Sequence, residues 1–329
     1  MNVGNTFPFR TASGFRPLKG LHIGHYGAVL RDVCALQYAR QSCSFVFIAD
    51  HHSRSTWKEK SDFLNTHKRT TELTRQLLAV GVNPEYSVIY RQSDVPEIFE
   101  FMWFLAGITS HGRLTRNPVL EESGEPTAGV YMYPLLMVAD ILSLRATHVV
   151  VGDDQKIHVE SARDVAKRLR GVFGEDFLPV PEYHRPDPVL IRGLKGRDKM
   201  DGAMGNEIYL FGDEDMIKDK VAKIVTTSVS YGNPLPTEDS VLLSYAEAIG
   251  GEAARKVFSA DFESSHFDYS DMKTKLLELF MDVVGPYREA HLKISPQDAE
   301  EILRCGGLRA REAVGNMIAE VRKHIGESF

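Results

Sequence analysis

The chain has 329 residues, 43% hydrophobic and 26% charged, which is the composition of an ordinary globular protein. Its net charge is −6, so any nucleic-acid partner must bind a local basic patch, and nothing points to DNA. We expect no signal peptide, because the charged start and apolar run of such a segment are missing, and no apolar run reaches the length of a membrane span. Cys34, Cys43 and Cys305 show no CxxC spacing. This favours a reduced, cytoplasmic protein without a disulfide framework or a zinc site.

Strand-like and helix-like segments alternate through the first part of the chain. Apolar, β-rich runs bounded by polar residues predict strands at residues 6–13, 44–50, 86–93 and 147–154. Segments with helical periodicity predict helices at residues 23–41, 60–80, 95–108, 131–146 and 155–174. Alternation of this kind predicts an α/β fold, a Rossmann-like parallel sheet with helices on both faces.

The pattern changes near residue 213, where the strand signal ends and helical patterns continue to the C-terminus. We therefore expect two domains, an α/β catalytic domain over residues 1–212 and an all-helical domain over residues 213–329. The stretch at 193–206 is rich in glycine and in basic residues. That composition disfavours a stable helix and predicts a mobile loop within the first domain.

The segment GLHIGHYG, residues 20–27, follows a glycine-containing turn between the first strand and the first helix. Helix N-termini bind phosphates readily, because their N–H groups are unpaired and carry partial positive charge. His22 and His25 are three residues apart, which places them on one side of the first helical turn, and Gly24 lets a nucleotide approach the backbone. The same spacing also fits a solvated helix start, so the segment alone does not decide between the two.

A second candidate site lies in the helix predicted over residues 131–146. Tyr133, Met137 and Asp140 stand at i, i+4 and i+7 and therefore share one face. Asp140 lies in an apolar run without a basic residue three or four positions away. A buried carboxylate needs a donor, which could be an N–H or O–H group of a substrate. A distant arginine or the end of another element would satisfy it equally well.

A third candidate is VGDDQ, where a buried strand ends at Gly152 and a helix begins at Gln155. The short polar side chains of Asp153 and Asp154 could bind a ligand amine or ribose hydroxyls. Aspartate is also a favoured helix N-cap, so a purely structural role fits as well.

The fourth candidate is the KGRDKMDGAMGN loop. Lys195, Arg197 and Lys199 on a flexible tether suit an anion that must be enclosed and then released, such as a polyphosphate. A solvated basic loop has the same composition.

Taken together and in order, these segments resemble the class I aminoacyl-tRNA synthetases, and within them the tryptophanyl-tRNA synthetases. LHIGHY matches the HxGH motif, and KMDGAMGN stands in the place of the KMSKS loop. YPLLMVADIL and VGDDQKIHVESARDVA are similar to the YPxLMAADIL and VGEDQxxHxExxRD signatures, and IADHHSRST to the DxHA(L/I)T segment. The similarity is collinear over essentially the whole chain.

The resemblance implies an ATP-dependent ligase that forms tryptophanyl-adenylate and pyrophosphate and passes the tryptophanyl group to tRNA(Trp). It implies ATP with Mg²⁺, no metal-ligating residue, helical anticodon recognition and a homodimer. The implied catalytic residues are His22, His25 and Lys199. The implied ATP-binding residues are these three with Ser13, Gly14, Gly24, Gly152, Asp154 and Met200. The implied tryptophan-binding residues are His52, Tyr133, Met137, Asp140 as acceptor of the indole N–H, and Gln155.

The loop departs from the family pattern. Where the family has Lys-Met-Ser-Lys-Ser, this chain has Lys199, Met200, Asp201, Gly202 and Ala203. Loss of the second lysine removes a charge-assisted contact of about 1.5–3 kcal/mol to the phosphates, which would slow activation by one or two orders of magnitude. Two alternatives to an active tryptophan enzyme therefore stay open. One is a degenerate paralogue that binds tryptophan, tRNA or a protein partner in a regulatory role, and the other is an enzyme that activates tyrosine.

Overall fold

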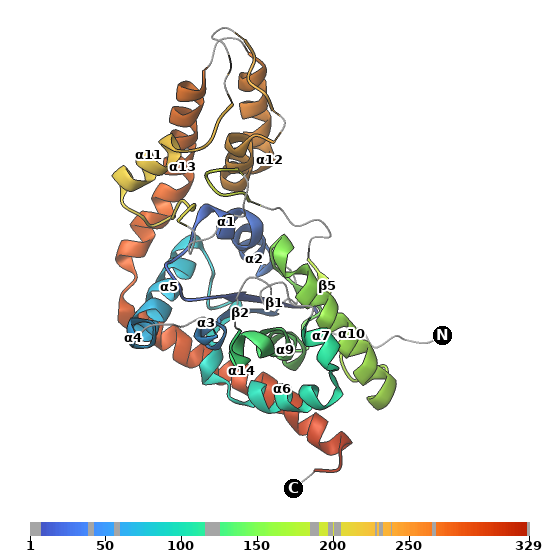
Figure 1. Cartoon of the computed structure of the whole chain (residues 1–329). Coiled ribbons are helices and arrows are strands. Elements are labelled where there is room, and N and C mark those ends of the chain that lie inside the picture. The colour runs from blue at the N-terminus through green and yellow to red at the C-terminus, as the bar shows by residue number, and fades with distance from the viewer. Residues whose placement is uncertain are drawn as a thin grey trace.

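The computed structural model in Figure 1 is an α/β fold that carries a helical C-terminal region. The described residues are 8–38, 43–55, 60–115, 126–184, 191–196, 200, 205–227, 229, 233–237, 239–264 and 268–327.

One sheet of five strands forms the centre of the molecule, in the order β3-β2-β1-β4-β5, with every pair parallel. The strands are β1 (Arg10–Phe15), β2 (Cys43–Ile48), β3 (Ser87–Arg91), β4 (His148–Val149) and β5 (Glu182–Tyr183). The chain runs outward from β1 to β2 and β3 and then returns to the other side of β1 as β4. This order confirms the predicted Rossmann-like sheet, and it opens a crevice between the carboxyl ends of β1 and β4.

Helices cover both faces of the sheet, as the sequence predicts (Figure 1). The helices before residue 213 are α1 (Ile23–His25), α2 (Arg31–Leu36), α3 (Asp50–Arg54), α4 (Lys60–Leu64), α5 (Thr66–Val80), α6 (Glu97–Ile108), α7 (His111–Leu114), α9 (Ala128–Ser143) and α10 (Lys156–Phe173). Alternate strand residues enter two different cores. Val46 and Ile48 pack with α5, whereas Phe45 and Phe47 pack with α6, α9 and α10.

The helix predicted over residues 23–41 is less regular than expected. A π-helical turn over Tyr26–Leu30 separates α1 from α2. Gly27 lies here against α12, where an added Cβ would stand 2.5 Å from the Cβ of Ala248. The turn therefore lies where α12 packs tightly against the start of the first helix. π-Helical turns of this kind are frequent beside functional sites.

After residue 213 the described residues form helices only, as expected. They are α11 (Glu214–Ala222), α12 (Val241–Glu263), α13 (Tyr269–Lys293) and α14 (Pro296–His324). α11, α12 and the start of α13 project from the sheet, while α14 runs back beneath it (Figure 1). Leu30 and Tyr245 belong to one hydrophobic cluster, so the core is continuous across residue 212. The division into domains at that position stays a prediction.

α14 packs directly on the edge strand β3. A Cβ on Gly306 would lie 1.8 Å from the carbonyl oxygen of Ile89, so no larger residue fits without a shift of the helix. Farther along α14, Ala310, Val314 and Met317 join the core of α6 and α9. An exposed edge strand is a site of unwanted pairing, and α14 covers it.

We predict that Gly306→Ala lowers the free energy of unfolding by about 3 kcal/mol, because the new methyl group overpacks the contact with β3. Gly315→Ala is the matched control on the same helix, since its added Cβ would meet nothing within 4 Å. We expect it to raise stability by about 0.5–1 kcal/mol through helix propensity. Urea unfolding of both variants measures the difference, and equal stability of the two would contradict the close packing of α14.

Candidate active site

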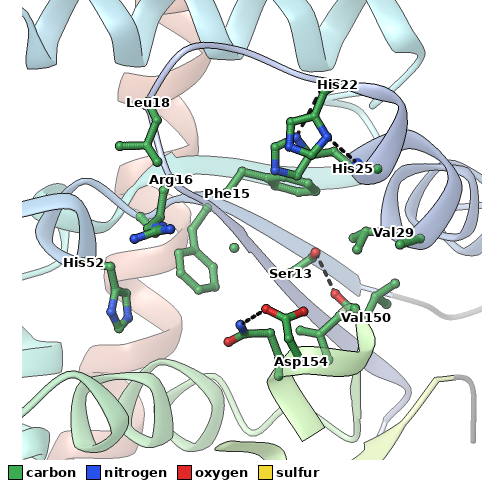
Figure 2. A pocket seen from close by; sticks show the side chains of 18 of the residues that line it. Ser13, Phe15, Arg16, Leu18, His22, His25, Val29, His52, Val150 and Asp154 are labelled. Carbon is green, nitrogen blue, oxygen red and sulfur yellow. Dashed lines mark hydrogen bonds between the residues drawn. The ribbon is translucent and has the colours of Figure 1, made fainter. Parts of the chain in front are cut away.

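A cavity lies in the crevice between the carboxyl ends of β1 and β4 (Figure 2). It brings together nearly every described residue that the sequence analysis assigned to a ligand. Those that line it are Ser13, Gly14, His22, Gly24, His25, His52, Tyr133, Met137, Gly152, Asp153, Asp154, Gln155 and Met200. The Ser13 hydroxyl donates to the carbonyl of Val150 at 2.9 Å, which ties the two strands together at the floor of the crevice. Lys199 lies outside the described residues.

The two histidines of the GLHIGHYG segment cap the first helix for each other. The backbone N–H of His25 donates to Nδ1 of His22, and the N–H of His22 donates to Nδ1 of His25, each at 3.4 Å. Their rings stack with centroids 3.7 Å apart. Because both Nδ1 atoms accept, each neutral ring carries its proton on Nε2. The pair can therefore act as two hydrogen-bond donors toward the cavity that both residues line (Figure 2).

Gly24 is held between His22 and the glycine-rich loop. An added Cβ would lie 2.9 Å from the His22 ring and 3.4 Å from the Cβ of Met200. The N–H of Gly24 points at the sulfur of Met200, 3.3 Å away, and Met200 donates its own N–H to the carbonyl of Ile191 at 2.9 Å. The loop that contains Met200 is therefore attached to the first helical turn at this residue.

The opposite end of the cavity is aromatic and apolar. α9 contributes Tyr133 and Met137, and the His52 ring stands edge-on to Tyr133 with centroids 4.4 Å apart. Burial raises the pKa of the Tyr133 hydroxyl, an effect that nearby Arg16 opposes. That hydroxyl is therefore protonated at neutral pH and can donate a hydrogen bond. This end of the cavity suits a flat aromatic ligand.

Asp140 does not line the cavity; it lies behind the wall and is fully buried. The side-chain amide nitrogen of Gln92 donates to both carboxylate oxygens at 2.8 Å. Nε2 of His52 lies 2.9 Å from Oδ2. Gln92 and His52 are thus the donors that the sequence analysis required, in place of a distant arginine or a helix end. That Asp140 accepts an indole N–H stays a prediction.

Neither aspartate of VGDDQ caps a helix. Asp153–Gln155 forms a 3₁₀ turn after Gly152, and α10 begins after Gln155. Asp154 instead accepts from the side-chain amide of Gln155 at 2.6 Å, and Asp153 pairs with Lys156 at 2.9 Å. The structural alternative of an N-cap is therefore wrong. Asp153, Asp154 and Gln155 all line the cavity, and Asp154 and Gln155 form a polar pair there.

The cavity also contains two cations that were not predicted from the sequence, Arg16 and Lys19. Both belong to the turn between β1 and α1, and neither forms an ion pair with another described residue. Figure 2 shows Arg16 on the same side of the cavity as His52. The detectable signal was a pair of basic residues inside the glycine-flanked stretch GFRPLKG, directly before the helix start.

Comparison with known proteins places this fold and site in a family. The model of class I tRNA synthetases for W and Y matches residues 5–284. A tryptophan–tRNA ligase of Porphyromonas gingivalis is 34% identical over 95% of this chain and 98% of its own length. The tryptophanyl-tRNA synthetase of Campylobacter jejuni, solved with ADP and tryptophan, superposes with a TM-score of 0.80 at 29% identity, covering 97% of this chain and 100% of that one.

The chain belongs to the class I tryptophanyl-tRNA synthetases. A Mycoplasma pneumoniae member of this family shares the fold, with a TM-score of 0.81 at 24% identity over 97% of this chain and 98% of that one. Within the described part of this synthetase, no helix is long and apolar enough to cross a membrane. The same part contains no cluster of three His, Cys, Asp or Glu side chains that could hold a metal ion.

His158 of this synthetase gives a pH-dependent prediction. Burial, and to a smaller extent neighbouring His52, lowers its pKa to about 4. Its unfolded pKa is about 6.5, so between these values the unfolded chain binds more protons and stability falls as pH falls. We predict that wild type loses about 1 kcal/mol more unfolding free energy than His158→Gln between pH 7.0 and 5.5. Urea unfolding at both pH values measures this. The exposed His111→Gln is the control, and an equal acid loss in all three proteins would contradict the prediction.

Proposed function

We propose that this chain activates tryptophan with ATP and transfers it from tryptophanyl-adenylate to tRNA(Trp). The observation that carries the proposal is the single cavity in which a histidine donor pair and an aromatic pocket face one space. Adenylate formation requires this arrangement, because the tryptophan carboxylate must meet the α-phosphorus of ATP in line. The aromatic wall holds the indole at one end, and the helix start holds the phosphates at the other.

At the phosphate end the chemistry is charge stabilisation. As the carboxylate attacks, negative charge moves toward the leaving pyrophosphate. Nε2–H groups of His22 and His25 donate to phosphate oxygens at the start of α1. Arg16 and Lys19 line the same cavity and add positive charge to it, Arg16 from the side of His52, and Lys199 binds the leaving group.

Mg²⁺ accompanies ATP in this proposal and is not held by a cage of protein ligands. Mg²⁺ commonly binds through substrate phosphates. The ion supplies charge neutralisation of the triphosphate. Ser13, Gly14 and Gly152 line the cavity. In this proposal the nucleotide backbone and ribose pass these residues, and Asp154 accepts a ribose hydroxyl.

At the tryptophan end Met137 packs on the indole, and His52 borders the pocket. Tyr133 and Gln155 hold the α-ammonium group. Asp140 accepts the indole N–H: four lone-pair sites are available on a carboxylate, and Gln92 and His52 make three contacts with it. A site that must satisfy a buried acceptor rejects analogues without the matching donor.

The proposals for tRNA recognition, oligomeric state and cellular location rest on other features of the molecule. The projecting helices α11 to α13 are proposed to read the tRNA anticodon, whose exposed bases can be stacked and hydrogen-bonded. A homodimer is supported by α6, where the Trp103 side chain is 76% exposed and Ile108 lies exposed five residues later. A cytoplasmic location is supported by the three free cysteines.

Tryptophan-dependent ATP–pyrophosphate exchange tests this function, run in parallel with tyrosine. We predict exchange with tryptophan and none with tyrosine at equal concentration. Asp140→Ala should lower kcat/KM for tryptophan at least tenfold, because a hydrogen bond to a charged group is lost (about 1.5–3 kcal/mol). Charging of tRNA(Trp) is measured separately, since adenylate formation does not guarantee transfer.

The alternatives give different results in the same assay. No exchange with either amino acid, from protein that still binds tryptophan, would contradict the enzyme and favour the paralogue suggested by Asp201 and Gly202. Exchange with tyrosine alone would overturn the specificity.

Arg16 gives a further prediction. Replacing it with Gln should lower kcat/KM for ATP by ten- to a hundredfold, the value of one charge-assisted contact of about 1.5–3 kcal/mol. Arg304→Gln is the control, because this arginine is exposed on α14 and pairs with Glu301. Pyrophosphate exchange at varied ATP measures both variants. An equal loss of kcat/KM in both variants, or no loss in Arg16→Gln, would show that Arg16 does not contribute to ATP binding.

A further inference from the structure

We infer that Gln92 is a positioning residue for amino-acid selection, which holds Asp140 and His52 together as the polar wall that recognises the indole N–H. This inference rests on the proposed function and deepens it. Gln92 follows β3 in the 3₁₀ turn Gln92–Asp94 and is fully buried. It does not line the cavity, so any effect on the ligand passes through its two partners.

One amide group contacts both members of the wall. Nε2 of Gln92 donates to Oδ1 and Oδ2 of Asp140 at 2.8 Å each. Its Oε1 accepts the backbone N–H of His52 at 3.3 Å. Nε2 of His52 closes the triangle at 2.9 Å from Asp140. The orientations of the carboxylate and the ring therefore depend on the same side chain.

The neutrality of the glutamine matters as much as its position. A buried carboxylate must be hydrogen-bonded, and an arginine or lysine would satisfy it while cancelling its charge. Among the described residues no such cation pairs with Asp140. Gln92 supplies donors without a positive charge, so it satisfies the carboxyl group of Asp140 without adding a cation that would repel the weak N–H donor of an indole.

An unpaired nitrogen atom of His52 is a second indication that this wall binds a ligand. Its Nδ1 is buried and has no hydrogen-bond partner among the described residues, although the residue lines the cavity. With Nε2–H directed at Asp140, Nδ1 is an acceptor. Nδ1 of His52 thus offers the cavity an acceptor, which suits a substrate that donates and disfavours an isosteric ring that cannot.

The test compares tryptophan with its sulfur isostere β-(3-benzothienyl)alanine, which lacks the N–H group. Calorimetry gives the Kd of each ligand, and pyrophosphate exchange gives kcat and KM. In Gln92→Leu we expect the Kd and KM for tryptophan to rise at least tenfold while kcat changes less than threefold. The preference for tryptophan over the isostere should fall at least fivefold. Gln92→Glu keeps the shape but replaces the donor with an acceptor, and it should lose the preference equally.

Gln37→Leu is the matched control. Gln37 is also a buried glutamine that joins two segments, donating to the carbonyl of Gly81 at 2.8 Å and accepting from the N–H of Asn83 at 2.8 Å. We expect this variant to lose stability and keep the wild-type preference. Retention of that preference in Gln92→Glu or Gln92→Leu, or its equal loss in Gln37→Leu, would overturn the inference. Wild type that neither binds nor activates tryptophan would instead refute the proposed function.

Discussion

The central position of β1 is the constraint on which the site depends. β1 pairs with β2 on one side and with β4 on the other, so the chain leaves its carboxyl end in one direction while the segment after β4 leaves in the other. The resulting crevice receives the helix start with His22 and His25 from one side and VGDDQ from the other. The β1–β4 ladder is short, and the Ser13–Val150 hydrogen bond extends it to the cavity floor.

The apolar end of the site depends on a buried charge. Asp140 lies on α9 among side chains of the hydrophobic core, where an unsatisfied carboxylate would cost several kcal/mol. Gln92 from the end of β3 and His52 from α3 satisfy it, so elements from two neighbouring strand ends support one side chain. The same hydrogen bonds to Asp140 therefore contribute both to the stability of the fold and to the selection of the ligand.

Much of this arrangement can be predicted from the sequence, because its signals are local. The continuous burial of β2 follows from its run of apolar residues, the helical period of α9 and α10 follows from neighbouring residues, and the HxGH segment lies within one turn. The pairing of Asp140 with Gln92 is different, because 48 residues separate them and only the sheet order brings them together. Arg16 and Lys19 lie in a short turn, which has no periodic pattern that could predict where their side chains point. Their direction becomes clear only when the positions of β1 and β4 are known.

The packing of α14 on β3 could not be predicted from the sequence either. Gly306 and Gly307 stand in a helical pattern, where glycine normally lowers helix stability. The need for glycine at these positions follows from close contacts with residues more than two hundred positions earlier, Ile89 for Gly306 and Asp94 for Gly307. The π-helical turn at Tyr26–Leu30 likewise lies where α12 approaches at Ala248. In each case the missing information is a long-range contact.

The most direct test of the account is a crystal structure of the protein with tryptophan and a non-hydrolysable ATP analogue. The account predicts the indole nitrogen within hydrogen-bond distance of the Asp140–His52 wall and the triphosphate at the Nε2 atoms of His22 and His25. It also predicts the tryptophan carboxylate facing the α-phosphorus. Either ligand bound outside the crevice between β1 and β4, or an indole turned away from Asp140, would contradict it.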